Sequence, residues 1–132
     1  EPGGPVPRIL DWLSVPWGVV SLNDSVPPPD GTAEGRTRRY AKMRELVSTA
    51  FTPFADRVAP VALAEKRVRL MGTSGTVTTL ASVHLELPQY DRQAVDGLIV
   101  PSESMREVCA RLSTMSAAER STLPCIGDDR AS

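Results

Sequence analysis

The feature that most constrains what this chain can fold into is the stretch of residues 68–81, in which glycines separate two apolar segments. Three of the four residues at 68–71 are apolar and none breaks regular structure, which is typical of a strand in a covered sheet. Gly72 and Gly75 then mark a turn, and apolar residues recur at helical spacing over residues 76–85. The pattern predicts a strand, a tight loop and a helix.

A strand that feeds a helix through such a loop can build an anion-binding site. The start of a helix leaves backbone N–H groups unpaired and carries the positive end of the helix dipole. Glycine lets the backbone approach a phosphate, and hydroxyl donors are available at Thr73, Ser74 and Thr76. The alternative is an ordinary strand-to-helix connection with a glycine turn and a hydroxyl cap, because short glycine motifs also arise by chance. The local pattern leaves both interpretations open.

The ten residues at 72–81, Gly-Thr-Ser-Gly-Thr-Val-Thr-Thr-Leu-Ala, resemble a known phosphate loop. It is the second-domain loop of the exopolyphosphatase and guanosine pentaphosphate phosphohydrolase family, which belongs to the actin-like ATPase superfamily. Glycine is commoner at the third loop position in that family, so Ser74 is a mild departure. Other segments agree with the family in the same order, namely residues 13–22, 90–97 and 125–132.

The resemblance implies an α/β fold of the ribonuclease H-like kind, with a mixed sheet and packed helices. We expect strands near residues 8–15, 67–71 and 98–100. The 132 residues would form a single partial domain, incomplete at both ends and drawn from the C-terminal part of the family's phosphatase core. Its uncovered sheet edges would favour dimerisation or exchange of segments between copies.

The resemblance also implies the activity: hydrolysis of the terminal phosphoanhydride bond of inorganic polyphosphate or guanosine pentaphosphate, assisted by magnesium. The family's catalytic glutamate and first phosphate loop lie in a first domain that this sequence lacks. We therefore expect no catalytic residue and no metal ligand here, and no turnover by the chain alone. The phosphate-binding residues would be Gly72, Thr73, Ser74, Gly75, Thr76 and Arg130.

Two other functional classes remain open. The chain could be a phosphate- or nucleotide-binding module without turnover, as in a relative of the sugar kinases. It could also be a scaffolding domain with no ligand, in which case side chains would block the loop at residues 72–76. Titration with ATP, guanosine pentaphosphate and short polyphosphate at equal ionic strength would separate binding with a substrate preference from these alternatives.

Helical patterns account for much of the remaining sequence. The longest covers residues 32–58, and Pro53 is expected to end or kink it, with a linking loop at residues 59–66. Ser102 is a candidate N-cap, and Ser116 begins a capping box. The first of these helices also carries a basic cluster, for which a solvated face is favoured over a phosphate site: Arg36, Arg38, Arg39 and Lys42.

Composition and charge exclude several classes. A formal net charge of −1 gives no reason to expect a nucleic-acid polymer or a membrane surface as partner. Cys109, Cys125 and His84 lack the spacing of a zinc site, so Cys109 is interpreted as a buried core thiol and His84 as a surface residue. With no signal-peptide pattern and no long apolar span, the cytoplasm is the expected location.

Overall fold

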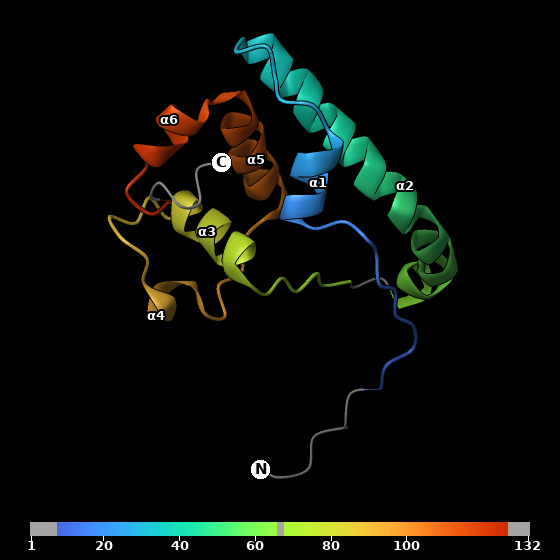
Figure 1. Ribbon diagram of the computed structural model, residues 1–132. Coiled ribbons are helices and arrows are strands. Elements are labelled where there is room, and N and C mark those ends of the chain that lie inside the picture. Colours follow the sequence, from blue (N-terminus) through green and yellow to red (C-terminus); the bar gives the residue numbers. More distant parts are fainter. Residues whose placement is uncertain (1–7, 66–67, 127–132) are drawn as a thin grey trace. The chain divides into compact units, whose positions relative to one another are not determined.

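The computed structural model describes residues 8–65 and 68–126, and within them all regular structure is helical (Figure 1). None of the described residues forms a strand. The helices are α1 (Val19–Ser25), α2 (Ala33–Glu65), α3 (Gly75–His84), α4 (Arg92–Val95), α5 (Ser102–Thr114) and α6 (Ala117–Ser121).

The expected α/β, ribonuclease H-like fold with a mixed sheet is therefore wrong for the described residues. Residues 8–15, 68–71 and 98–100 are not helical, but they pair with no strand. Leu70 is 96% exposed and Met71 91%, so this apolar run is not covered on either face. An apolar run becomes a strand only where neighbours supply hydrogen bonds and bury its side chains, and the described residues supply neither. Because the described residues form no sheet, they have no sheet edges that could favour dimerisation.

The chain divides into two compact units, and α2 contributes to both. The first unit consists of residues 1–27 and 42–69, and the second of residues 28–41 and 70–132. The boundary between Arg69 and Leu70 precedes the candidate loop, which therefore belongs to the second unit together with α3 to α6.

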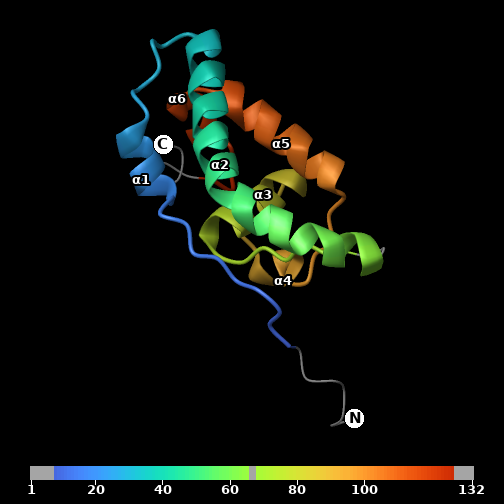
Figure 2. The same cartoon turned by 90° about the vertical axis from the view of Figure 1, so that its right-hand side faces the viewer.

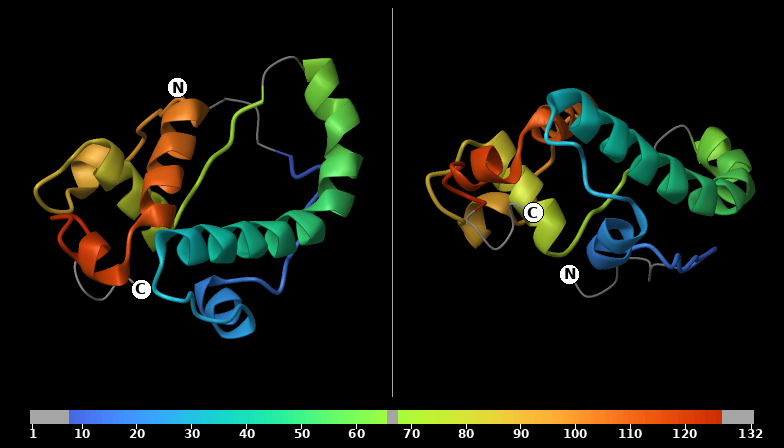
Figure 3. Two further views of the ribbon diagram at one scale, coloured as in Figure 1. Left: turned by 90° about the horizontal axis from the view of Figure 1, so that it is seen from above. Right: turned by 45° about the horizontal axis from the view of Figure 1, so that its top comes forward.

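Helix α2 continues through two prolines, Pro53 and Pro60, and ends only at Glu65. The expected end near Thr52 and the expected linking loop are both wrong for the described residues. Each proline removes one backbone hydrogen bond, but the segment between and after them contains alanines, which favour the helix and allow it to resume. The axis of α2 changes direction within its green C-terminal half, as a proline kink requires (Figure 3).

In the first unit, an ion pair joins the N-terminal segment to the kinked part of α2. The guanidinium of Arg57 contacts both carboxylate oxygens of Asp11, with Nε 2.7 Å from Oδ2 and Nη2 3.3 Å from Oδ1. The hydrogen bond from Arg57 lowers the pKa of Asp11. The same guanidinium stands 5.7 Å from the ring centroid of Phe54, a cation–π contact on the same helix.

Helix α1 is short, and the two valines at its start are not buried. Val19 and Val20 are 67% and 73% exposed. The helix begins where the Gly18 amide donates to Ser21 Oγ at 2.8 Å, which satisfies one of the unpaired amides at its start. Local hydrogen bonding, rather than burial of valines, fixes this element.

The second unit has a small apolar core between α3 and α5, whose axes lie side by side (Figure 2). Val83 of α3 and Val108 of α5 are buried there, together with Ile126 beyond α6. Helix α4 packs against α3 and is capped by Asp91, whose Oδ1 accepts from the Gln93 amide at 2.8 Å. Five partly buried side chains complete the core: Leu80, Met105, Leu112, Leu123 and Cys125.

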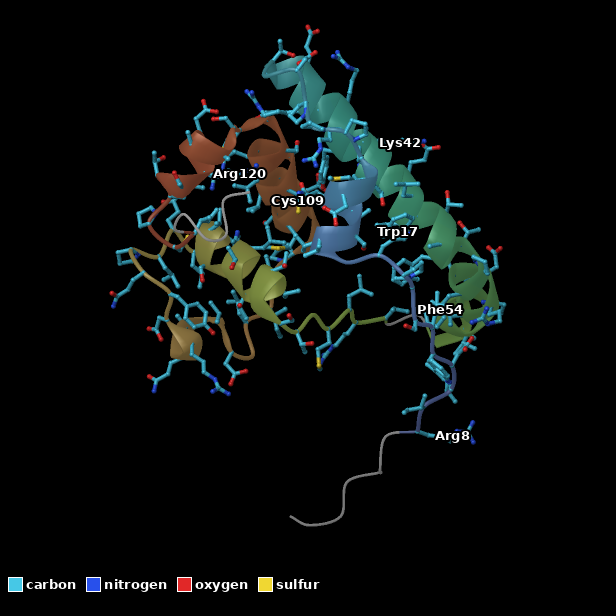
Figure 4. The ribbon with its side chains drawn as sticks, in the orientation of Figure 1. Arg8, Trp17, Lys42, Phe54, Cys109 and Arg120 are labelled. Carbon is cyan, nitrogen blue, oxygen red and sulfur yellow. The ribbon has the colours of Figure 1, made fainter. Side chains whose placement is uncertain are left out.

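The predicted starts of α5 and α6 have different outcomes. Ser102 is the first residue of α5 rather than its N-cap, and Pro101 before it provides no side-chain cap. The capping box of α6 is confirmed: Ser116 Oγ accepts from the Glu119 amide at 3.2 Å, and the Glu119 carboxylate accepts from the Ser116 amide at 2.7 Å. Cys109 on α5, labelled in Figure 4, is partly exposed, so it is not the fully buried thiol expected.

No helix in the described part of the chain is both long enough and apolar enough to cross a bilayer.

Candidate functional site

The candidate loop, residues 72–76, lies open at the N-terminus of α3. All five residues are exposed, so no side chain plugs the turn. The first backbone bond of α3 runs from the Thr78 amide to the Ser74 carbonyl, at 3.2 Å. The amides of residues 75–77 precede it and have no carbonyl partner within the helix, and Ser74 provides no side-chain cap. These donors and the positive end of the helix dipole therefore face solvent.

Ser74 holds the loop in an unusual backbone conformation. Its φ of 86° and ψ of 170° lie in a region that is accessible almost only to glycine. This is the loop position at which Ser74 departs from the commoner glycine. The loop therefore keeps the geometry of a glycine although the residue is a serine, and the serine stores strain there.

Gly72 is required for a different reason, namely space. A Cβ placed on Gly72 would lie 2.7 Å from Cγ1 and 3.0 Å from Cγ2 of Val77. Because a helical valine has one strongly preferred rotamer, Val77 cannot easily turn away. Gly72 thus lets the incoming chain pass close to the first turn of α3, and this approach defines the loop.

The hydroxyl groups near the loop fall into two sets. Thr78 and Thr79 donate back to the Gly75 carbonyl at 3.0 and 2.8 Å, and Ser82 donates to the Thr78 carbonyl at 2.9 Å. These three are occupied by the helix itself. The three hydroxyls that the sequence singles out are on exposed residues and make no such bond within the described part of the chain: Thr73, Ser74 and Thr76.

Arg130, the predicted phosphate-binding residue outside the loop, lies beyond the described residues. His84, interpreted as a surface residue, is the last residue of α3, at the opposite end of the helix from the loop, and it is partly buried. No part of the described chain gathers three or more His, Cys, Asp or Glu side chains that could hold a metal.

The described residues therefore offer no set of ligands for the magnesium ion that the resemblance implies. Magnesium usually binds through one or two carboxylates together with water and substrate phosphates. The loop contains no carboxylate, so it does not fit as a magnesium site by itself.

The basic cluster at the start of α2 separates into two pairs of residues. Arg38 contacts Asp30 at 2.9 Å and Glu34 at 3.8 Å, and Lys42 contacts Glu45 at 2.9 Å. All of these side chains are well exposed, so Arg38 and Lys42 form the solvated face that the sequence analysis favours. Arg36 and Arg39 are both partly buried.

Sequence reasoning missed Arg120 on α6. Burial lowers its pKa most, followed by the positive charges of Arg39 and Arg36. Its Nε is buried and has no hydrogen-bond partner among the residues that the structure describes. The sequence carries no clear signal for this, because Arg120 follows a capping box in a stretch that otherwise reads as an exposed short helix.

Comparison with known proteins gives one relationship. No family model matches the chain, and no solved structure matches it significantly. Two curated proteins do, both named exopolyphosphatase 2, from Mycobacterium tuberculosis strains CDC 1551/Oshkosh and ATCC 25618/H37Rv. Each is 35% identical over 88 residues, which is 67% of this chain and 26% of the relative. The chain thus spans about a quarter of the length of these relatives, and over two thirds of its own residues it is similar to an exopolyphosphatase.

Proposed function

We propose that this chain contributes the phosphate-binding loop of a hydrolase that removes terminal phosphates from inorganic polyphosphate. The observation that carries the proposal is the open helix start at residues 72–76, in a chain similar to exopolyphosphatase 2. In a scaffolding domain, side chains would block the loop, whereas this loop is open and its amides are free. Guanosine pentaphosphate, which presents the same phosphoanhydride chemistry, is the second candidate substrate.

The chemistry follows from the charges of the substrate. In phosphoryl transfer, the protein mainly positions the substrate and stabilises charge on the non-bridging oxygens. The amides of residues 75–77 would donate to these oxygens, and the hydroxyls of Thr73 and Thr76 would add two further donors. Arg130 and magnesium remain part of the proposal as a further cation on the phosphates and as a charge-neutralising ion.

The group that orients or deprotonates water must come from another part of the protein, because the loop carries no carboxylate or other base. We therefore expect the chain alone to bind short polyphosphate but to release no phosphate from it. Phosphate release above a protein-free blank, abolished by Gly75→Val, would contradict this expectation. Binding without release by the full-length protein as well would favour the module without turnover.

The loop itself is tested by removing one amide without breaking the helix. Gly75 is the first residue of α3, a position where proline is tolerated because its missing N–H has no partner in the helix. Gly75→Pro should weaken tripolyphosphate binding, measured by calorimetry at constant ionic strength, while the helical circular dichroism is retained. Gly75→Ala keeps the amide and is the matched control. Equal affinity of the two variants would rule out the Gly75 amide as a ligand.

A further inference from the structure

Two aspartates of the second unit are followed by glycine: Asp30 precedes Gly31 shortly before α2, and Asp96 precedes Gly97 directly after α4. An aspartate in this setting is chemically vulnerable, because the amide nitrogen of the next residue can attack its side-chain carboxyl group. Glycine favours the attack, since it has no Cβ to obstruct the approach and restricts the backbone least. Both glycines have a positive φ, 84° and 71°, and a Cβ on either would meet nothing within 4 Å. The backbone alone therefore does not distinguish the two sites.

The carboxylate of Asp30 is held by three donors. They are the Thr32 amide at 3.0 Å, the Thr32 hydroxyl, and the Arg38 guanidinium at 2.9 Å. The bonds from Thr32 lower the pKa of Asp30, so less of its carboxyl group is protonated, which is the form from which oxygen leaves as water. Gly31 is held as well, because its carbonyl accepts from Arg36 Nη1 at 2.8 Å. Attack at Asp30 would first have to break charge-assisted hydrogen bonds.

Asp96 is exposed, and its carboxylate makes no hydrogen bond or ion pair with any residue that the structure describes. Its main chain forms a type II turn, with φ −71° and ψ 125° at Asp96, φ 71° at Gly97, and a bond of 3.3 Å from the Leu98 amide to the Val95 carbonyl. Rotation of the central peptide group converts such a turn to type I, and glycine accepts the resulting negative φ as readily as a positive one. The same rotation moves the Gly97 nitrogen relative to the Asp96 side chain and lets it reach Cγ.

We propose that Asp96 is a modification site, at which the folded chain isomerises to isoaspartate, whereas the hydrogen bonds of Asp30 protect it. The Gly97 nitrogen forms a bond to Cγ of Asp96, and the C–O bond of the carboxyl group breaks. The hydroxyl oxygen leaves as water and takes the amide proton with it, which closes a succinimide ring. Water then opens the ring at either carbonyl carbon, and addition at the main-chain carbonyl leaves isoaspartate with a free α-carboxylate. That carboxylate is the substrate of the methyltransferases that esterify isoaspartyl residues.

The test ages the intact folded chain at neutral pH and maps its peptides. Isoaspartate has the same mass as aspartate, so electron-transfer fragmentation distinguishes the two linkages at each site. Transfer of a labelled methyl group by an isoaspartyl methyltransferase measures the total. Isoaspartate should form at Asp96 at least about tenfold faster than at Asp30, because freeing the Asp30 carboxylate costs at least one charge-assisted hydrogen bond. Equal rates at the two sites, or a faster reaction at Asp30, would overturn the proposal.

The same chain unfolded in guanidinium chloride is the control, because both aspartates are then free of their partners and each is still followed by glycine. The two rates should come close together. A ratio as large as that in the folded chain would mean that neighbouring residues in the sequence set the rates, and the structural argument would fail. Isoaspartate that forms at Asp96 only after unfolding would show that the turn protects this site, which also overturns the proposal.

Asp96→Glu assigns the methylation signal to one residue. Glutamate keeps the negative charge at this exposed position but would have to close a larger ring, which forms far more slowly. The variant should therefore lose most of the methyl incorporation of the aged wild type. Asp30→Glu makes the same change before the other glycine and should keep that incorporation. Full incorporation in Asp96→Glu, or its loss in Asp30→Glu, would place the reactive residue elsewhere and refute the assignment.

Discussion

At the scale of single residues, the loop depends on one serine in a conformation that suits glycine. The backbone of Ser74 at φ 86° stores strain, and such strain costs about 1–3 kcal/mol for a residue with a Cβ. Ser74→Gly removes this cost but adds flexibility to the unfolded chain, worth about 0.5–1 kcal/mol. We expect a net stabilisation of up to about 2 kcal/mol, measured by urea denaturation.

Ser74→Ala provides the control, because alanine loses the hydroxyl but keeps the Cβ that causes the strain. It should leave the free energy of unfolding close to that of the wild type. If alanine stabilises the chain as much as glycine does, the hydroxyl rather than the backbone conformation is responsible, and the strain argument fails.

The contact between Gly72 and Val77 predicts a coupled pair. Gly72→Ala places a methyl 2.7 Å from Cγ1 of Val77 and should destabilise the chain by about 1–3 kcal/mol, the usual cost of overpacking. Val77→Ala removes both obstructing methyl groups. In a double-mutant cycle, the double variant should therefore recover most of the loss from Gly72→Ala. Additive effects of the two substitutions would mean that they do not meet.

The sequence predicted the turn and the helix after it, although not the strand before them, because the determinants of the turn and the helix are local. Glycine spacing, hydroxyl residues and the helical period after residue 75 all act within one turn of chain, and α3 begins within a residue of the expected start. In the sequence, Ser74 is only a mild departure from glycine, whereas the structure places it at the strained position. Backbone strain cannot be read from residue type alone, because serine is common in unstrained helix caps.

At the scale of elements, local rules predicted the start of α6 but not the N-cap of α5, and they failed where tertiary contacts decide. The capping box of α6 followed from Ser116 and Glu119, three residues apart. Among the residues that the structure describes, none of the three expected strands forms, because a strand needs partners that are often distant in sequence. The hydrogen bond from Arg36 to the last residue of α5 joins residues 78 positions apart, so no local sequence pattern predicts it.

The capping box also predicts how stability depends on pH. Hydrogen bonds from the Ser116 amide and hydroxyl lower the pKa of Glu119 below its ordinary value of 4.5. A carboxyl group with a depressed folded-state pKa stabilises the fold above the unfolded pKa, and this contribution is lost as pH falls through the folded-state value. Glu119→Ala should therefore reduce stability near neutral pH, and the difference from wild type should shrink once the pH falls below 4.5.

Glu103→Ala controls for the loss of a surface carboxylate. Glu103 contacts Arg106 at 2.9 Å in an exposed pair, which is the kind that contributes little. Its effect should be small at every pH in urea denaturation curves. A gap between Glu119→Ala and the wild type that stays constant down to low pH would show that the carboxylate charge plays no part.

At the scale of the whole molecule, burial is unevenly divided between the two units. The second unit has a core in which Val83 and Val108 join α3 to α5, whereas residues 42–65 of α2 contain no buried residue among those described and are interrupted by two prolines. Local opening is easiest where few apolar side chains are buried and where backbone hydrogen bonds are exposed. We therefore expect amides of α3 and α5 to exchange with solvent more slowly than those of residues 42–65.

Hydrogen exchange measured by mass spectrometry checks this expectation, and one substitution shows whether the units open separately. Val83→Ala weakens the core of the second unit and should speed exchange in α3 and α5 while leaving residues 42–65 unchanged. Leu63→Ala, at a side chain 79% exposed, should change neither region. If Val83→Ala accelerates both regions equally, the chain opens as one cooperative unit, and the small core around α3 supports the whole molecule rather than the candidate loop and its neighbours alone.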